Sequence, residues 1–446
     1  MVLRAWSPEE QLTLLSRGTI EILPEAGALL ERLCRCAHEG RPLRVKQGFD
    51  PTAPDIHLGH TVGLRKLRQF QGLGHQVVLI VGDYTGMVGD PSGRSRARPQ
   101  LSAAEVEAHA RTYLEQFFKV LDPAPVPPCL PVEIHRNGEW FAGMQFMDVM
   151  RLASNYTVAR ILERDDFAAR MRDRQPISLH ELFYPIMQGY DSVAVRADVE
   201  LGATEQKFNL LVGRALQETH GQAPQIAMTL PVLPGLDGVQ RMSKSLGNYV
   251  GVTDEARDMY GKLMSLPDKV MSEYWQLVTD ASPQELAELA PELELAKKSA
   301  ITVDDLKQVG RYAPMELKKR LAHRVVTMYH GRDAADQAQR DFVAQFSRRE
   351  IPENVEEYRL PELEVPLGRK VTVGTIIDHI VGSGIASTRS AARRLVEQKA
   401  VRIDDQRIME HSFEVVLEPG KGFILRVGRQ LRRYSFSRDV PPKGQG

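Results

Sequence analysis

The chain reads G-F-D-P-T-A-P-D-I-H-L-G-H from Gly48 to His60, where a strand pattern gives way to a helix pattern. The strand is expected over residues 43–49 and the helix over residues 57–71, with Asp55 as its N-cap. A continuous apolar run follows at residues 76–81 and is typical of a strand buried on both faces. Strand, helix and strand in this order predict a right-handed βαβ unit, and therefore an α/β, Rossmann-like domain with a parallel sheet.

The end of this stretch has the character of a phosphate site. His57 and His60 are three residues apart, so both imidazoles fall on one face of the first helical turn. Gly59 between them lets a ligand approach the backbone closely. A helix N-terminus adds unpaired N–H groups and a partial positive charge. A solvated histidine pair at a helix start has the same spacing, so the stretch alone leaves both interpretations open.

A glycine-rich loop, residues 82–96, follows the second strand, where parallel sheets place their ligands. The chain carries neither the dinucleotide fingerprint G-x-G-x-x-G nor the P-loop G-x-x-x-x-G-K-[ST]. A nucleotide bound here is therefore held in another way.

The bulk composition is that of a soluble globular protein, with 42% hydrophobic and 26% charged residues among 446. That length predicts two or three domains. No apolar run approaches the ~20 residues that span a bilayer, and the N-terminus has no signal-peptide core. Cys34, Cys36 and Cys129 match neither a disulfide framework nor a zinc pattern. We expect a cytoplasmic protein without a structural metal and without a membrane partner.

The formal net charge of zero conceals an asymmetry. Residues 369–433 carry 13 Lys+Arg against 7 Asp+Glu, whereas residues 1–368 carry 43 against 50. A basic C-terminal segment on an acidic body indicates a nucleic-acid-binding appendage, although an ordinary solvated surface can show the same bias.

The pattern predicts four segments. Helical periodicity dominates residues 101–190 and 253–346, and residues 347–368 are rich in proline and acids. Beyond them, short helices at 373–383 and 387–398 precede short strands at 400–403, 413–416 and 422–427. We expect a catalytic domain over residues 1–250, a helical domain over 251–346, a linker over 347–368 and a small α+β domain over 369–435.

A second motif lies far along the chain, at residues 240–248, which read Q-R-M-S-K-S-L-G-N. Glycines on both sides and two serines predict a mobile loop. Arg241 and Lys244 on such a loop can close over a polyphosphate. Taken alone, the loop is equally well a basic surface turn.

The two motifs together, H-x-G-H early and [KR]-M-S-K-S late, resemble the joint signature of class I aminoacyl-tRNA synthetases over residues 45–250. The resemblance implies ATP as a substrate, accompanied by Mg²⁺. It implies catalytic contacts to the phosphates from His57, His60, Lys244 and Arg241. Further ATP contacts are expected from Gly48, Asp50, Gly59, Glu205 and Met242.

A helix pattern narrows the amino-acid substrate. Tyr184, Gln188 and Asp191 stand at i, i+4 and i+7 and so share one helical face, which is unusual for an apolar packing surface. This stretch resembles the tyrosine-pocket helix of bacterial tyrosyl-tRNA synthetases. The resemblance implies that Tyr184 and Gln188 hold the substrate ammonium and that Asp191 accepts a hydrogen bond from the phenol.

Two more segments extend this resemblance. The G-D-P-S-G run at residues 89–93 implies that Asp90 contacts the ammonium. The G-A-T-E-Q run at residues 202–206 implies that Glu205 binds the ribose and Gln206 lies near the tyrosine carboxylate.

The basic C-terminal segment resembles an S4 RNA-binding domain in its T-R-S-A-A-R-R-L-V and A-V-R-I-D runs. The resemblance implies tRNA(Tyr) as the partner and a homodimer as the assembly. The expected tRNA contacts are Arg94, Arg98, Arg389, Arg393, Arg394 and Arg402.

Four positions depart from the family pattern. Lys46 stands where many relatives have a tyrosine whose hydroxyl meets the substrate phenol. Glu205 replaces an aspartate, while Arg241 and Arg94 replace lysines. The three conservative changes keep their charge, and they indicate a divergent branch of the family.

Alternative functions remain at this stage. A tryptophanyl-tRNA synthetase shares the fold and both signatures, but usually lacks the S4-like tail and the Tyr-x-x-x-Gln-x-x-Asp helix. An RNA-binding regulator built on a decayed synthetase would not need His57, His60, Asp90 and Lys244 intact. The length of the chain argues against a small H-x-G-H nucleotidyltransferase.

Overall fold

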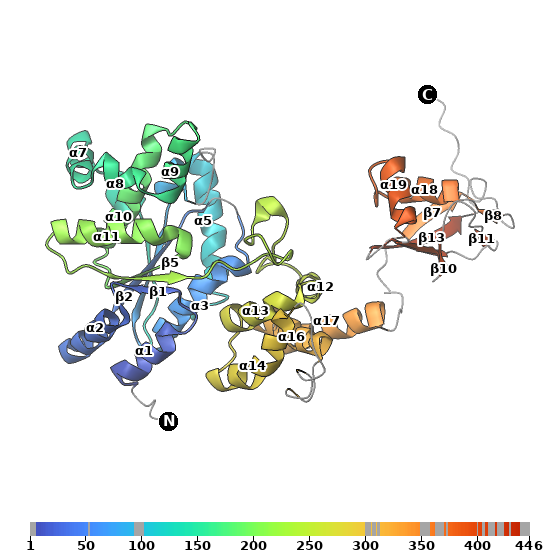
Figure 1. The fold of residues 1–446 in the computed structure, drawn as a ribbon, viewed down its shortest axis with the longest axis horizontal. Helices are drawn as coiled ribbons and strands as arrows, with labels where there is room; N and C mark the ends of the chain where they lie inside the picture. Colours follow the sequence, from blue (N-terminus) through green and yellow to red (C-terminus); the bar gives the residue numbers. More distant parts are fainter. Residues whose placement is uncertain are drawn as a thin grey trace. The chain divides into compact units, whose positions relative to one another are not determined.

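A computed structural model describes two compact units, Met1–Arg340 and Asp341–Gly446 (Figure 1). The residues described are 6–51, 54–92, 102–298, 305, 309, 313–347, 357–361, 370–371, 373–398, 400–403, 406–408, 415–416, 423–427 and 430–437.

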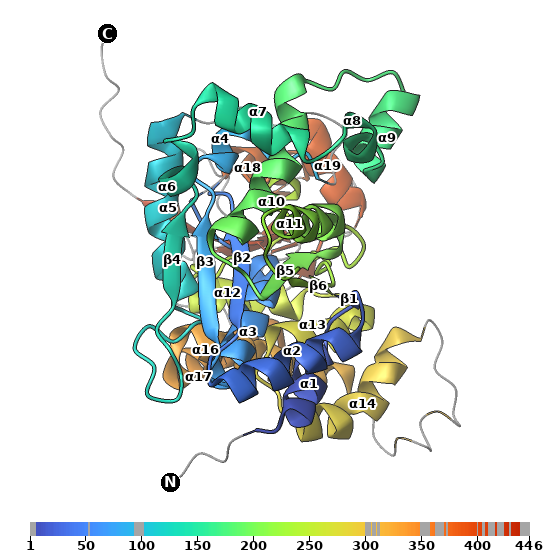
Figure 2. The same ribbon diagram turned by 90° about the vertical axis from the view of Figure 1, so that its left-hand side faces the viewer.

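A six-stranded sheet organises the first unit, in the order β1-β6-β5-β2-β3-β4 (Figure 2). The five strands from β2 to β6 are parallel to their neighbours, and only β1 pairs antiparallel, with β6. The strand order changes direction at β2, which is where open α/β sheets place their ligands. The bounds are β1 (Glu21–Leu23), β2 (Arg44–Phe49), β3 (Gln76–Val81), β4 (Glu133–Arg136), β5 (Val199–Ala203) and β6 (Ile226–Leu230).

The expected βαβ unit is present as β2, helix α3 (Leu58–Gly72) and β3. The predicted N-cap was wrong, because His57 and not Asp55 caps α3. The Gly59 amide donates to His57 Nδ1 at 3.2 Å, and the His57 amide donates to His60 Nδ1 at 3.2 Å. The two imidazoles thus satisfy orphan amides reciprocally, as in a capping box.

Alternation along β2 sends neighbouring side chains to opposite faces of the sheet. Lys46 reaches helix α10 (Tyr184–Ala194), whereas Gln47 lies against Gly63 of α3. Helix α11 (Lys207–Thr219) packs on α10 and on strands β5 and β6. Helix α10 is therefore tied to the sheet through Lys46 and packs against its neighbour α11.

The remaining described elements of the first unit are helical. Before β5 they are α1 (Pro8–Ser16), α2 (Ala26–Glu39), α4 (Thr85–Val88), α5 (Ala103–Phe117), α6 (Gly138–Phe141), α7 (Phe146–Ser154), α8 (Val158–Leu162), α9 (Asp165–Arg172) and η1 (Leu179–Phe183). After it they are η2 (Thr204–Gln206), η3 (Lys244–Leu246), α12 (Ala256–Met264), η4 (Asp268–Val270), α13 (Met271–Val278), α14 (Pro283–Lys297), α16 (Pro314–His330) and α17 (Arg332–Phe342), which runs into the second unit and is followed there by η5 (Val343–Ser347). Helix α13 packs on α3 and α16, which ties the helical segment to the sheet layer.

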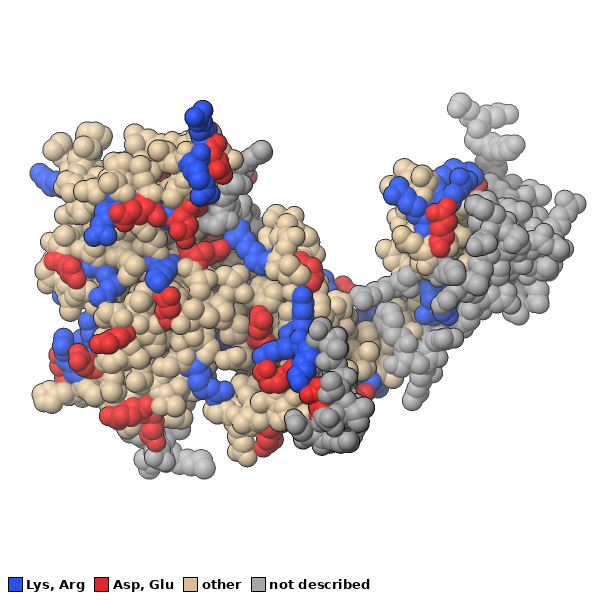
Figure 3. Space-filling model, viewed as in Figure 1, with Lys and Arg blue, Asp and Glu red and all other residues tan. Residues whose placement is uncertain are grey.

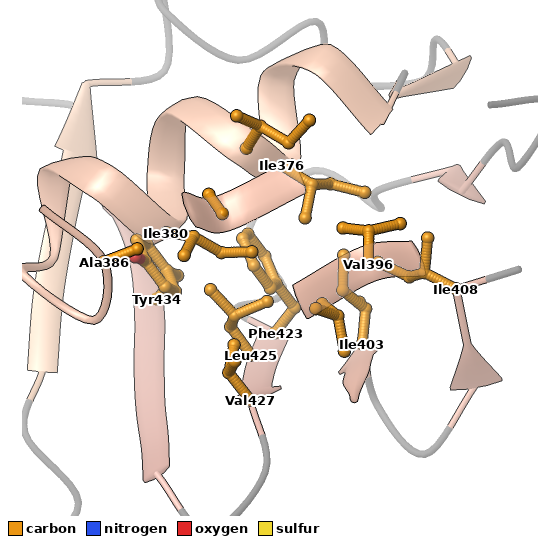
Figure 4. Packing of buried hydrophobic residues seen from close by; sticks show 13 residues of the cluster. Ile376, Ile380, Ala386, Val396, Ile403, Ile408, Phe423, Leu425, Val427 and Tyr434 are labelled. Atoms are coloured by element: carbon orange, nitrogen blue, oxygen red, sulfur yellow. The ribbon is translucent and has the colours of Figure 1, made fainter. Parts of the chain in front are cut away.

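The second unit pairs two helices, α18 (Val373–Gly382) and α19 (Arg389–Glu397), with a five-stranded sheet of order β10-β9-β12-β13-β7. The residues expected as a linker contribute one of these strands, β7 (Glu357–Pro361), which runs parallel to β13. The helices pack over an apolar core that includes Ile380, Phe423 and Leu425 (Figure 4). The other strands are β8 (Lys370–Val371), β9 (Val401–Ile403), β10 (Gln406–Arg407), β11 (Val415–Val416), β12 (Phe423–Val427) and β13 (Gln430–Ser437).

Candidate active site

A cavity of about 250 Å³ opens at the carboxyl ends of β2, β3, β5 and β6. This is the edge of the sheet at which the sequence predicted ligand binding. Ten of the predicted site residues line it: Gly48, Asp50, Gly59, His60, Asp90, Tyr184, Gln188, Asp191, Glu205 and Gln206.

Asp191 is a buried carboxylate in the wall of this cavity. Trp140 Nε1 donates to its Oδ1 at 3.0 Å, and Asn137 Nδ2 donates to its Oδ2 at 3.4 Å. Burial raises the pKa of Asp191 to about 7, while the nearby charge of Lys46 and the two donors oppose that rise. The carboxylate is thus oriented from behind and can accept a hydrogen bond from a ligand hydroxyl.

Lys46, the main departure from the family pattern, is fully buried but does not line the cavity. Its ammonium lies 3.0 Å from Glu200 Oε1, and donates to Ser192 Oγ at 2.7 Å and to the Gln188 carbonyl at 3.2 Å. These three partners use the three ammonium hydrogens. Lys46 therefore braces the back of α10 and, unlike Asp191, is not placed to meet a ligand in the cavity.

Hydrogen bonds between side-chain amides connect α10 to Asp90 along the cavity wall. Asn209 Nδ2 donates to Gln188 Oε1 at 2.9 Å and to Gln206 Oε1 at 3.0 Å. Gln206 Nε2 in turn donates to Asp90 Oδ2 at 2.7 Å, and the Ser92 amide donates to Asp90 Oδ1 at 2.8 Å. The amide oxygens and the Asp90 carboxylate gather acceptors at one place, which suits an ammonium group.

Asp50, predicted to contact ATP, is hydrogen-bonded to helix α10. The Tyr184 hydroxyl donates to Asp50 Oδ2 at 2.8 Å, and Thr85 Oγ1 donates to its Oδ1 at 2.7 Å. The carboxylate therefore bridges the loop after β2 to the start of α10.

The imidazoles of His57 and His60 lie one against the other, with ring centroids 4.0 Å apart. Burial, together with electrostatic repulsion from the neighbouring His60 and Lys244 side chains, lowers the pKa of His57 to about 2. His57 is therefore neutral at physiological pH. A Cβ at Gly59 would lie 2.9 Å from the His57 ring, so a residue larger than glycine would displace the imidazole.

The signature loop, residues 240–248, lies against the N-terminus of the same helix, α3. The Met242 side chain is buried 3.6 Å from the position of a Cβ at Gly59, and its amide donates to the Leu233 carbonyl at 2.9 Å. Asn248 ties the loop together, since it accepts from the Ser243 amide at 2.8 Å and donates to the Arg241 carbonyl at 3.1 Å. The loop backbone is thus anchored.

Both basic side chains of the loop, Lys244 and Arg241, contact acidic residues. Lys244 Nζ donates to the Asp55 carbonyl at 2.6 Å and lies 3.6 Å from its carboxylate. Partial burial lowers the pKa of Lys244, and Asp55 opposes that change. Arg241 Nη1 donates to both carboxylate oxygens of Glu205, at 3.0 and 2.9 Å. The structure brings the loop, the histidine pair and the cavity wall together.

The predicted tRNA contacts fall into two groups, apart from Arg402, which lies half-buried on β9. Arg94 and Arg98 lie outside the described residues. Arg389, Arg393 and Arg394 are exposed on α19, and Figure 3 shows basic side chains on this unit. Arg389 is paired with Asp378.

The sequence reasoning missed several residues of the site: Asn137, Trp140, Ser192, Glu200 and Asn209. One signal was available. Lys46 and Glu200 place opposite charges in two neighbouring strands of the sheet, and buried charges are expected to pair. The others come from segments without a distinctive pattern.

The chain matches the family model for class I tRNA synthetases (W and Y) over residues 38–347 and the S4 domain model over residues 377–417. A tyrosine–tRNA ligase of Moorella thermoacetica is 49% identical, with 94% of each chain covered. One of Carboxydothermus hydrogenoformans is 46% identical, covering 95% of this chain and 96% of the relative.

Solved structures agree on the fold. A C-terminally truncated mitochondrial tyrosyl-tRNA synthetase of Aspergillus nidulans superposes with a TM-score of 0.60 at 19% identity, covering 76% of this chain and 94% of that one. A tyrosyl-tRNA synthetase of Archaeoglobus fulgidus complexed with L-tyrosine gives 0.57 at 20% identity, covering 74% and 99%. The motifs, the cavity and these relatives lead to one conclusion: the chain belongs to the tyrosyl-tRNA synthetase family of class I, with a C-terminal S4 domain.

Proposed function

We propose that the cavity activates L-tyrosine with ATP and then transfers the tyrosyl group to the 3′ end of tRNA(Tyr). One observation carries this proposal. Asp191, a buried acceptor, shares a cavity with His60 and Glu205, and the latter holds the signature loop through Arg241. A phenol acceptor and a polyphosphate-binding loop thus meet in one site.

In the first step the tyrosine carboxylate attacks the α-phosphorus of ATP and pyrophosphate leaves. The residues of the site act by positioning and by stabilising charge on the phosphates. His57 contributes as a neutral hydrogen-bonding group, because its pKa lies near 2. Lys244 and Arg241 supply positive charge to the departing pyrophosphate. Mg²⁺ enters with ATP, held mainly by the phosphates.

The second step needs the tyrosyl-adenylate to stay bound while tRNA arrives. A terminal ribose hydroxyl of the tRNA attacks the adenylate carbonyl, and AMP leaves. Gln188 and Asp90 would hold the ammonium throughout, through the amide chain that Asn209 orders.

Selectivity for tyrosine follows from Asp191. Phenylalanine would leave its carboxylate without the phenol donor in a desolvated pocket, which costs binding free energy. Tyrosyl-tRNA synthetases are themselves the standard example of such rejection, at roughly 10⁵-fold, without editing.

Pyrophosphate exchange with each of the twenty amino acids tests the proposal. We expect exchange with tyrosine alone, followed by charging of tRNA(Tyr). Exchange with tryptophan in its place would favour the alternative synthetase. Absence of exchange with every amino acid, together with tight RNA binding, would favour a regulator.

A homodimer is the assembly we propose, and an apolar surface supports it. Consecutive helices α7, α8, α9 and η1 expose large apolar side chains, among them Phe146 at 76% and Leu179 at 72%. Both ribbon views draw α7, α8 and α9 at one end of the first unit (Figures 1 and 2). Clustered apolar exposure of this kind marks an interface. A monomeric mass in sedimentation analysis at micromolar concentration would contradict the dimer.

For tRNA binding, the α19 arginines are supplemented by a cross-strand pair, Arg402 on β9 opposite Arg426 on β12. Like charges directly opposite are unfavourable unless an anion lies between them. A phosphate of the tRNA backbone would fill that role.

Tyrosine, ATP and tRNA occur together in the cytoplasm, where we place this protein. Among the described helices, none combines the length and apolar character required to cross a bilayer.

A further inference from the structure

Two of the positions that depart from the family pattern are in direct contact. Arg241 belongs to the signature loop and Glu205 to the cavity wall, 36 residues apart in sequence. Arg241 Nη1 lies 3.0 and 2.9 Å from the two carboxylate oxygens, and each side chain is about one-third exposed. The longer acid and the longer, forked base therefore form a matched pair.

The pair conflicts with the roles that the proposed function gives its members. Glu205 is to accept hydrogen bonds from the ribose, yet both of its oxygens already face a cation. Arg241 is to bind pyrophosphate, yet its guanidinium is already paired with the carboxylate of Glu205. A partly exposed ion pair is weak, so a ligand can exchange it.

The backbone limits how this exchange can happen. The Arg241 carbonyl accepts from Asn248 Nδ2 at 3.1 Å, and the next residue, Met242, is buried and bonded to Leu233. The main chain is held at this point, and a rotation of the Arg241 side chain alone would free Glu205.

The other loop cation is not arranged in this way. The Lys244 ammonium donates a hydrogen bond to the main-chain carbonyl of Asp55, and Asp55 does not line the cavity. A ribose entering the cavity therefore meets the partner of Arg241 and not that of Lys244.

We propose that Glu205 and Arg241 form a hand-over pair: the ribose hydroxyls replace Arg241 on Glu205, and the released guanidinium moves to the phosphates of the same nucleotide. This inference rests on the proposed function and deepens it, because it makes ribose recognition the step that releases Arg241. Adenosine, which has the ribose but no phosphate, must displace Arg241 without giving it a new partner.

Adenosine is accordingly the probe that tests the pair. We expect Arg241→Met to tighten adenosine binding by about 3-fold, the size of an exposed ion pair, measured at equilibrium by ligand-observed NMR without turnover. 2′,3′-Dideoxyadenosine, which lacks both hydroxyls, should show no change. In a Glu205→Gln background, Arg241→Met should no longer affect adenosine.

Lys207→Met is the matched control, because it removes one positive charge two residues from Glu205, from a side chain that pairs with Glu21 instead. It should leave adenosine binding unchanged. Unchanged or weaker adenosine binding in Arg241→Met, or equal tightening of the dideoxy compound, would overturn the hand-over. A normal adenosine response without tyrosine-dependent exchange would instead overturn the proposed function and leave the pair standing.

Discussion

Lys46 shows how a single buried charge fixes its surroundings. It is fully buried, as is Glu200, and their charged atoms lie 3.0 Å apart. Glu200 also accepts from Ser192 Oγ at 3.0 Å and from Gln188 Nε2 at 3.3 Å. The pair therefore orients one turn of α10 from behind, where many relatives are expected to use a tyrosine that reaches the substrate itself.

Removing only one partner of this pair should be costly. Lys46→Met leaves Glu200 as an unpaired buried charge, so we expect the free energy of unfolding to fall by about 3–5 kcal/mol. The double substitution Lys46→Met with Glu200→Gln should recover most of that loss. Chemical denaturation of the three proteins measures both effects. A single variant as stable as the unaltered protein would show that the charges do not depend on each other.

Asp191 predicts a pH dependence of stability. Its pKa is about 7 in the folded protein and near the ordinary value of 3.8 when unfolded. Between these values the folded state binds more protons, so this contribution is present below pH 4 and is lost as the pH rises through 7. Asp191→Asn removes the titration.

The measurement is the difference in unfolding free energy between the unaltered protein and Asp191→Asn. We expect that difference to move against the unaltered protein as the pH rises from 4 to 7, and to be flat above pH 8. Taking a difference cancels the groups common to both proteins, including His57, whose lowered pKa acts in the opposite direction. A flat difference from pH 4 to 7 would contradict the raised pKa.

Among the elements, those with a strong pattern could be predicted from the sequence. The apolar run of β3 was located to the residue, and β2 to within one. Strand β4 reads E-I-H-R, is only partly buried at the edge of the sheet and has no apolar run to mark it. In β5, Glu200 interrupts the apolar pattern because its partner, Lys46, comes from another strand. Such elements are defined by tertiary contacts that a local pattern does not contain.

The signature loop is the element that the proposed mechanism links most directly to the rate of adenylate formation. Lys244 donates to the Asp55 carbonyl and does not line the cavity, and in the proposed mechanism its charge is needed only where pyrophosphate departs. We expect Lys244→Ala to slow adenylate formation by at least ~100-fold, with little change in tyrosine affinity, because the lost interaction belongs to the transition state.

Single-turnover kinetics separate the two effects for Lys244→Ala. The rate constant for adenylate formation should fall, while the dissociation constant for tyrosine stays within a factor of about two. Lys207→Met is again a suitable control, because that lysine pairs with Glu21. Equal losses in tyrosine binding and in rate would contradict the role given to Lys244.

At the scale of the molecule, the residues of the candidate active site and the basic helix α19 belong to different compact units. The second unit has an apolar core of its own. The basic excess of residues 369–433, which suggested a nucleic-acid-binding appendage, lies within the second unit.

This division predicts that the two reaction steps can be separated. A chain ending at residue 347 keeps every cavity residue, so tyrosine-dependent pyrophosphate exchange should stay within about two-fold of the full chain. It loses the basic unit and its phosphate contacts, so tRNA charging at limiting tRNA should fall by at least ~100-fold. The full chain carrying Arg393→Gln and Arg394→Gln tests the same loss without truncation, and its charging should become less sensitive to salt. Exchange and charging that fall together in the truncated chain would show that the second unit supports the catalytic site itself.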